Sequence, residues 1–149
     1  MREEFNLEEF FKAVMRQFDN LKPDEAIMQH PLVLAYLGDT IYDVFIRTLM
    51  VSKNIGNVNK LHKATTAYVK AKSQAETLYA ISQMLTEEEA YVVKRGRNAK
   101  AGTIPKNADV MEYKHATGFE ALLGYLYLKR DFERLMHILC LSAQTKRDI

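Results

Sequence analysis

Apolar residues recur at helical spacing along most of the chain, and no stretch shows the alternation of a half-buried strand. Residues 5–18 illustrate the pattern, because Leu7, Phe11, Val14 and Phe18 fall on one face of a helix. No internal repeat is present in the sequence. The pattern of apolar and polar positions therefore predicts an all-α protein.

Two stretches are apolar nearly all round. Residues 32–51 form the first, and Pro31 suits the first position of a helix that continues to about residue 52. We expect this helix to be central and packed by others on most sides. Residues 119–128 form the second stretch. Each contains an acid where a core residue is expected, Asp39 in the first and Glu120 in the second.

Shorter helices are predicted between these two stretches. Residues 58–81 show helical spacing and predict two helices with a junction at about residues 66–69. Thr86 and Glu89 have the spacing of a capping box, which predicts the start of a short helix. We expect Gly96 to end that helix.

The remaining segments are a loop and two helices. Residues 96–107 are rich in Gly, Asn and Pro, which is the composition of a loop. A helix can start at Asp109, and residues 131–143 predict a closing amphipathic helix. Cys140 lies among apolar residues of this last helix, so we expect it in the core.

Composition limits the class of protein. A chain of 149 residues has the size of one globular domain, which we assign to residues 1–149. With 48% hydrophobic and 27% charged residues, a disordered or fibrous chain is excluded. The single cysteine cannot form an intramolecular disulfide. Acids interrupt residues 32–51, so no membrane span is expected, and the N-terminus does not resemble a secretion signal, which predicts a cytoplasmic protein.

Positive charge is unevenly distributed although the net charge is only +2. Residues 44–75 and 90–108 contain no acid, and both segments carry several Lys or Arg residues. A flexible basic loop with glycines can approach phosphates closely, so the second segment predicts nucleic-acid contact. A solvated charged face is the alternative. The residues that we expect to bind are Lys94, Arg95, Arg97, Asn98, Lys100, Thr103 and Lys106.

The two acids within apolar stretches are best explained by a shared cation. Carboxylate oxygens suit Mg²⁺ or Mn²⁺, so Asp39 and Glu120 are candidate metal ligands. Two other arrangements remain open. Thr117 and Glu120 also fit a capping box, and Asp43 can pair with Arg47 four residues later.

Several motifs resemble those of a known family. Residues 34–39, LAYLGD, look like the signature of ribonuclease III endonuclease domains, and residues 119–124, FEALLG, look like their second acidic motif. Further blocks are similar to the Mini-III ribonucleases, short bacterial members without a double-stranded RNA-binding domain. These blocks are residues 61–63, 71–76, 94–100 and 105–107. The resemblance covers about residues 30–130.

The resemblance implies the ribonuclease III endonuclease-domain fold, with Asp39 and Glu120 as the catalytic, metal-binding carboxylates. It implies a homodimeric endoribonuclease that uses Mg²⁺, with Mn²⁺ as a possible substitute. The implied reaction is hydrolysis of double-stranded RNA to 5′-phosphate and 3′-hydroxyl ends, in maturation of the large-subunit (23S) ribosomal RNA precursor. Ala35 and Thr117 stand where larger relatives carry two more carboxylates, so we expect weak cation binding until RNA phosphates complete the shell.

A-form RNA offers phosphates and 2′-hydroxyls to the protein, and we expect Lys70 and Lys72 to join the basic loop in contacting them. Two other classes of protein remain as alternatives. One is a non-catalytic RNA-binding or ribosome-assembly module on the same fold, and the other is a helical protein that binds an acidic partner. The first of these needs no acids within apolar helices, so Asp39 and Glu120 favour the nuclease over it.

Overall fold

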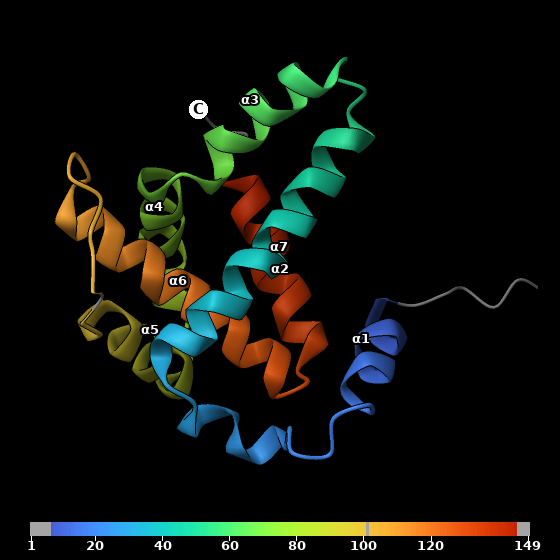
Figure 1. Cartoon of the computed structure of the whole chain (residues 1–149), viewed down its shortest axis with the longest axis vertical. Helices are drawn as coiled ribbons and strands as arrows, with labels where there is room; N and C mark the ends of the chain where they lie inside the picture. Colours follow the sequence, from blue (N-terminus) through green and yellow to red (C-terminus); the bar gives the residue numbers. More distant parts are fainter. Residues whose placement is uncertain (1–6, 101, 146–149) are drawn as a thin grey trace, which may run out of the picture.

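The computed structural model describes residues 7–100 and 102–145, and within them it contains helices and no strand (Figure 1). The predicted all-α class is therefore confirmed. Two short 3-10 segments, Pro23–Met28 and Ser82–Met84, accompany the α-helices. The α-helices are α1 (Leu7–Met15), α2 (Pro31–Ser52), α3 (Val58–Val69), α4 (Ala71–Ile81), α5 (Glu87–Asn98), α6 (Val110–Leu128) and α7 (Phe132–Gln144).

Helix α6 lies at the centre of the fold that the described residues form. It packs against α2, α4, α5 and α7, and most of its second half is buried (Figure 1). Helix α2 buries one side through Leu34, Tyr42 and Ile46, whereas Tyr36 and Val44 are exposed. The expectation that α2 is packed on most sides is therefore wrong. Its outward apolar residues cannot be told from its inward ones by hydrophobicity alone.

Helices α2 and α6 touch through their backbones at two glycines. A Cβ atom on Gly38 would overlap the carbonyl oxygen of Glu120, and one on Gly124 would overlap the carbonyl oxygen of Leu34. No side chain can occupy either space, so only glycine permits this close crossing. The crossing places Asp39, which follows Gly38, beside the turn of α6 that carries Glu120.

A second glycine contact joins α5 to α6. A Cβ atom on Gly96 would lie 2.9 Å from the Cα atom of Gly118. The prediction that Gly96 ends a helix is wrong, because α5 continues to Asn98. Gly96 serves close packing between helices, which composition cannot distinguish from a helix stop. The predicted loop is correspondingly shorter, and Arg97 is helical.

The corner between α3 and α4 falls at Lys70, next to the predicted junction. Side chains of α4 satisfy backbone carbonyls that the end of α3 leaves without helical partners. Ser73 Oγ donates to the carbonyl oxygen of Ala67, and Gln74 Nε2 donates to that of Val69 at 2.8 Å. These two bonds fix the direction in which α4 leaves the corner.

The predicted helix starts are confirmed by their caps. Thr86 and Glu89 form the capping box, with Glu89 also paired to Arg134 of α7 at 2.8 Å. Asp109 caps α6 through the backbone N–H of Glu112. A capping pattern predicts a helix start correctly because its hydrogen-bond partners lie within one helical turn of each other.

The closing helix is confirmed, but the prediction for its cysteine is wrong. Cys140 is exposed, because α7 turns Ile138, Leu139 and Ser142 inward and places Cys140 on its solvent side. Successive residues point about 100° apart around a helix, so apolar neighbours in the sequence do not show which of them is buried. None of the helices in residues 7–100 and 102–145 has both the length and the hydrophobicity of a membrane span.

The glycine crossing generates a stability prediction. Gly124→Ala forces the α2 and α6 backbones apart, and we expect it to lower the free energy of unfolding by about 3 kcal/mol. Gly102→Ala is the matched control, since a Cβ atom there meets nothing within 4 Å. Urea unfolding followed by circular dichroism measures both. An unchanged urea midpoint for Gly124→Ala would contradict the close crossing.

Candidate active site

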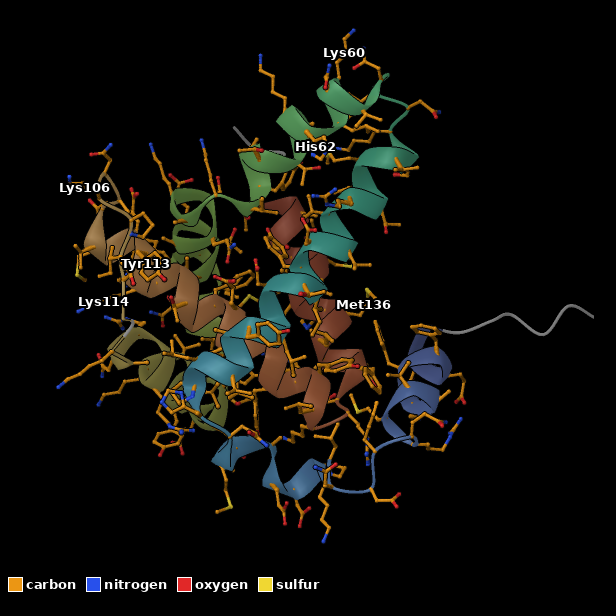
Figure 2. All side chains as sticks on the ribbon, in the orientation of Figure 1. Lys60, His62, Lys106, Tyr113, Lys114 and Met136 are labelled. Atoms are coloured by element: carbon orange, nitrogen blue, oxygen red, sulfur yellow. The ribbon has the colours of Figure 1, made fainter. Side chains whose placement is uncertain are left out.

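A cavity of about 310 Å³ opens between α2, α6 and the corner of α3 and α4. Its α2 wall includes Asp39, and its α6 wall includes Tyr113, which Figure 2 labels, and Glu120. Gln74 lines it from α4. The structure thus brings the two predicted carboxylates together from separate helices.

The two carboxylates differ in their exposure to water. Glu120 is half-buried, whereas Asp39 is exposed at the cavity. The expectation that Asp39 occupies a core position is wrong, because this face of α2 borders the cavity rather than a neighbouring helix. Asp39 therefore avoids the cost of burying a carboxylate, while Glu120 does not.

Burial of the carboxyl group raises the pKa of Glu120 to about 8, and the negative charge of Asp39 and a hydrogen bond with it act in the same direction. Glu120 is therefore mostly protonated at neutral pH when no cation is bound. A divalent cation that binds both oxygens must displace that proton. A positive charge bound between the two carboxyl groups would favour the ionised form of Glu120, which burial and Asp39 disfavour.

Two positions at which the sequence resemblance implies carboxylates in larger relatives border the same cavity. Ala35 lies one turn before Asp39 on α2, and Thr117 lies nearly one turn before Glu120 on α6. Thr117 Oγ1 donates to the carbonyl oxygen of Tyr113 at 3.0 Å within an uninterrupted helix, which excludes the capping-box alternative for Glu120. Of the residues that line the cavity, two are therefore carboxylates, Asp39 and Glu120.

The other acid of the apolar stretch has a separate partner. Asp43 accepts a hydrogen bond from Arg47 Nε at 2.8 Å, as the spacing of four residues allows, and it does not line the cavity. The part of the chain that the structure describes contains no group of three or more His, Cys, Asp or Glu residues able to hold a metal ion. Within the described ranges, Asp39 and Glu120 thus form a pair that no third His, Cys, Asp or Glu residue joins.

Gln74 is a cavity residue to which the sequence assigns no role, although it lies within the block of residues 71–76 that carries part of the family resemblance. Its side chain is 3% exposed, and its Oε1 atom has no hydrogen-bond partner among the described residues. A glutamine between small residues of an amphipathic helix carries no signal of its own. Only the corner at Lys70 turns it toward Asp39 and Glu120, which together form the acid pair.

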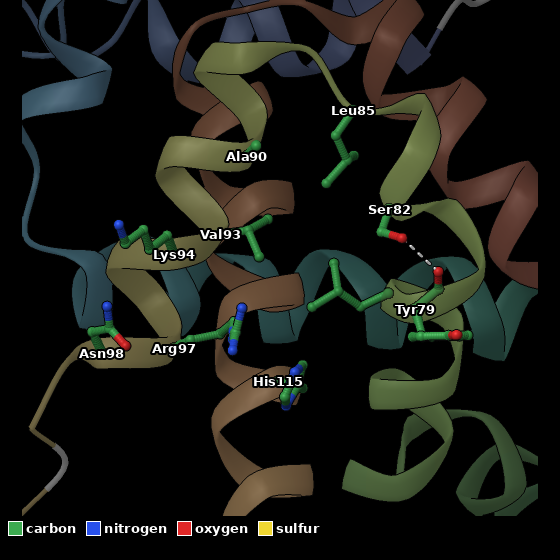
Figure 3. A pocket seen from close by; sticks show the side chains of 10 residues that line it. Tyr79, Ser82, Leu85, Ala90, Val93, Lys94, Arg97, Asn98 and His115 are labelled. Atoms are coloured by element: carbon green, nitrogen blue, oxygen red, sulfur yellow. Dashed lines mark hydrogen bonds between the residues drawn. The ribbon is translucent and has the colours of Figure 1, made fainter.

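The predicted RNA-binding residues fall into separate groups. Lys70 and Lys72 are exposed beside the cavity, next to its lining residues Val69 and Ala71. Other exposed residues lie on the non-helical segment that leads into α6, where Figure 2 labels Lys106. These are Lys100, Thr103 and Lys106. Lys94, Arg97 and Asn98 line a different cavity, shown in Figure 3.

Arg95 has partners within the protein. Its Nη1 atom donates to the carbonyl oxygen of Ile27 at 2.6 Å, and its Nη2 atom donates to that of Gln29 at 3.2 Å. Its guanidinium also lies over the ring of Tyr91 at 5.7 Å from the centroid. These contacts tie α5 to the segment before α2, so the observed contacts of Arg95 are structural.

A family model described as Ribonuclease III domain matches residues 32–131, which include α2 from its second residue onward, the acid pair and α6. The chain belongs to the ribonuclease III family. The enzyme is an endoribonuclease, and the sequence-based resemblance to this family is confirmed. The non-catalytic and protein-binding alternatives find no support in these relatives.

Relatives of the enzyme match over most of their length. It is 50% identical to "Mini-ribonuclease 3" of Thermoanaerobacter sp. over 89% of this chain and 96% of the relative. It is 47% identical to "Mini-ribonuclease 3" of Clostridium tetani over 93% of this chain and 85% of that one. A crystal structure of a Fusobacterium nucleatum protein is similar, with a TM-score of 0.72 and 35% identity over 79% of this chain and 94% of that chain.

The raised pKa of Glu120 generates a prediction for the metal-free enzyme. The folded state holds the Glu120 proton more tightly than the unfolded state, so stability falls as pH rises from about 4.5 toward 8. Glu120→Gln removes this penalty. We expect the variant to exceed the wild type by on the order of 2 kcal/mol at pH 8.5 in EDTA, and to match it near pH 4.5. Urea unfolding at the two pH values measures the difference, and equal stabilities at pH 8.5 would contradict the assigned burial cost.

Proposed function

We propose that the enzyme hydrolyses double-stranded RNA in a Mg²⁺-dependent reaction that leaves 5′-phosphate and 3′-hydroxyl ends. The observation that carries this proposal is the convergence of Asp39 and Glu120 on one cavity from two helices. The names of the relatives support ribonuclease chemistry. A precursor of large-subunit (23S) ribosomal RNA in the cytoplasm is the natural substrate that we propose.

The acid pair fits a hard divalent cation. Mg²⁺ commonly binds through one or two carboxylates and completes its shell with water and substrate phosphates, so Asp39 and Glu120 suffice as protein ligands. Mn²⁺ accepts the same oxygen ligands. When bound, the cation supplies an activated water and neutralises charge on the scissile phosphate. Because Ala35 and Thr117 add no carboxylate, RNA phosphates would contribute to holding the metal.

Two groups of exposed basic and polar residues are proposed to hold the RNA backbone. Lys70 and Lys72 lie at the corner of α3 and α4, and the segment before α6 contributes Lys100, Thr103 and Lys106. All of these side chains are exposed. Such contacts with phosphates position an A-form duplex without reading its sequence.

A homodimer is proposed because a duplex has two strands and a two-fold dimer supplies two symmetry-related sites. The exposed apolar face of α2 offers an interface, with Val33, Tyr36, Val44 and Val51 on it. Tyr36 is 77% exposed and also borders the acid pair. An interface here would place the two active sites near the dimer axis.

Sedimentation velocity tests the dimer at micromolar concentration. We expect the wild type to sediment as a dimer and Tyr36→Ala to shift the population toward monomer, because a large aromatic side chain leaves the proposed interface. Tyr91→Ala on α5 is the matched control, since Tyr91 is also exposed but lies outside this face. A wild type that remains monomeric would rule out the two-site arrangement.

Cleavage of a long RNA duplex tests the acid pair. We expect Asp39→Asn and Glu120→Gln each to lower the rate by more than about 100-fold, because changes around metal ligands alone often cost 10–100-fold. EDTA should have the same effect. Asp43→Asn is the control, since Asp43 pairs with Arg47 away from the cavity, and it should retain near wild-type activity. Full activity in Asp39→Asn would refute the proposed site.

The salt dependence of RNA binding tests the basic residues. In EDTA, so that no cleavage occurs, the Lys70→Ala/Lys72→Ala double variant should bind duplex RNA more weakly. Its slope of log affinity against log salt should fall by up to about two, since each lost phosphate contact removes somewhat less than one unit. Lys12→Ala/Lys22→Ala is a control of equal charge away from the cavity. If both double variants show the same slope, the contacts at the corner are not made.

A further inference from the structure

A second cavity, of about 480 Å³, lies between α4, α5 and α6 (Figure 3). His115 borders it from α6. In contrast, Tyr113, Thr117 and Glu120 of the same helix border the first cavity, which contains the acid pair. At 100° per residue, His115 falls on the far side of α6 from those three residues. The second cavity is therefore separate from the acid pair, and ribonuclease chemistry leaves it without a role.

The cavity is apolar at one end and polar at the other. Leu85 and Ala90 lie at one end, with Val93 between the two ends (Figure 3). Arg97 and His115 lie at the other end, across from the exposed ring of Tyr79 (Figure 3). No acid is among its lining residues. Such a cavity suits a ligand that joins an anionic group to a planar or apolar body.

Arg97 is the residue that most clearly lacks a partner. Among the described residues, the other half-buried arginines each have hydrogen bonds: Arg95 to two carbonyls, Arg130 to the carbonyl of Leu21, and Arg134 to Glu89. Arg97 is half-buried and has no hydrogen bond or ion pair with any residue in the described ranges. A guanidinium with five donors favours a bidentate anion, such as phosphate.

Other polar side chains line the same end of this cavity as Arg97. Lys94 lines it nearly one turn before Arg97 on α5, and Asn98, which directly follows Arg97, lines it as well. His115 forms a hydrogen bond through Nδ1 with the carbonyl oxygen of Met111 at 2.7 Å, which leaves Nε2 for a ligand. Tyr79 is 83% exposed and offers a free aromatic face. Nucleobases stack on such faces irrespective of their identity.

We propose that this cavity binds a nucleotide, with its phosphate at Arg97 and its base against Tyr79 and the apolar end. The volume falls in the usual range for small-molecule sites, about 300–1,000 Å³. The ligand is either a free nucleotide or one unpaired nucleotide of an RNA strand, since both present the same phosphate and base. Binding needs no metal and does not depend on the proposed function of the acid pair.

The test is a titration of the full chain with 5′-AMP in EDTA, followed by NMR of the Arg97 side-chain N–H and the His115 ring. We expect both signals to shift at up to millimolar AMP, with adenosine and inorganic phosphate each binding at least about tenfold more weakly. Arg97→Gln keeps the stem that packs near Gly118, and should weaken AMP binding about tenfold. Tyr79→Ala should weaken it about fivefold or more.

Arg16→Ala and Tyr91→Ala are the matched controls, because both residues are exposed and neither lines the cavity. A 5′-phosphorylated oligoadenylate of four nucleotides separates the two sources. Binding at least tenfold tighter than AMP identifies an RNA strand, and binding equal to or weaker than that of AMP identifies a free nucleotide. The proposal is overturned if AMP shifts neither signal, if inorganic phosphate binds as tightly as AMP, or if Tyr79→Ala and Arg97→Gln both bind AMP like the wild type. RNA cleavage, or its absence, has no bearing on these outcomes.

Discussion

The backbone contact between α2 and α6 is the constraint on which the rest of the structure depends. Two helices normally keep their axes apart by the size of their side chains. Here Gly38 and Gly124 remove that spacing, and each faces a carbonyl oxygen of the other helix. The carboxylates of Asp39 and Glu120 are brought together because the backbones that carry them are in contact. A rigid scaffold of this kind holds catalytic groups more accurately than a loop does.

The sequence predicted most helices correctly because their signals are local. Capping residues act within one turn, and apolar periodicity depends on the chain alone, so Thr86, Glu89 and Asp109 were assigned their observed roles. The acid pair was also anticipated, since carboxylates within apolar helices and the ordered motifs both drew attention to Asp39 and Glu120. The sequence predicts that these two carboxylates lie close together. Only the fold shows which other residues form the cavity around them.

The errors concern properties that arise only when helices meet. Gly96 looked like a helix stop, but it makes room for Gly118 of another helix. Cys140 looked buried, and Asp39 looked like a core residue, because an apolar segment does not indicate which face another helix will cover. The sequence likewise does not show whether a charged side chain is bound within the protein or open to a ligand. Arg95 and Arg97 are two residues apart, yet one is held by carbonyls and the other lines an open cavity.

Gln74 combines two tasks that are usually divided between residues. Its amide nitrogen holds the carbonyl of Val69 at the corner where α3 gives way to α4, and the same side chain forms part of the cavity wall beside the acid pair. The shape of that wall and the heading of α4 are therefore not independent. We therefore expect a substitution that reshapes the cavity at this position also to alter the direction of α4.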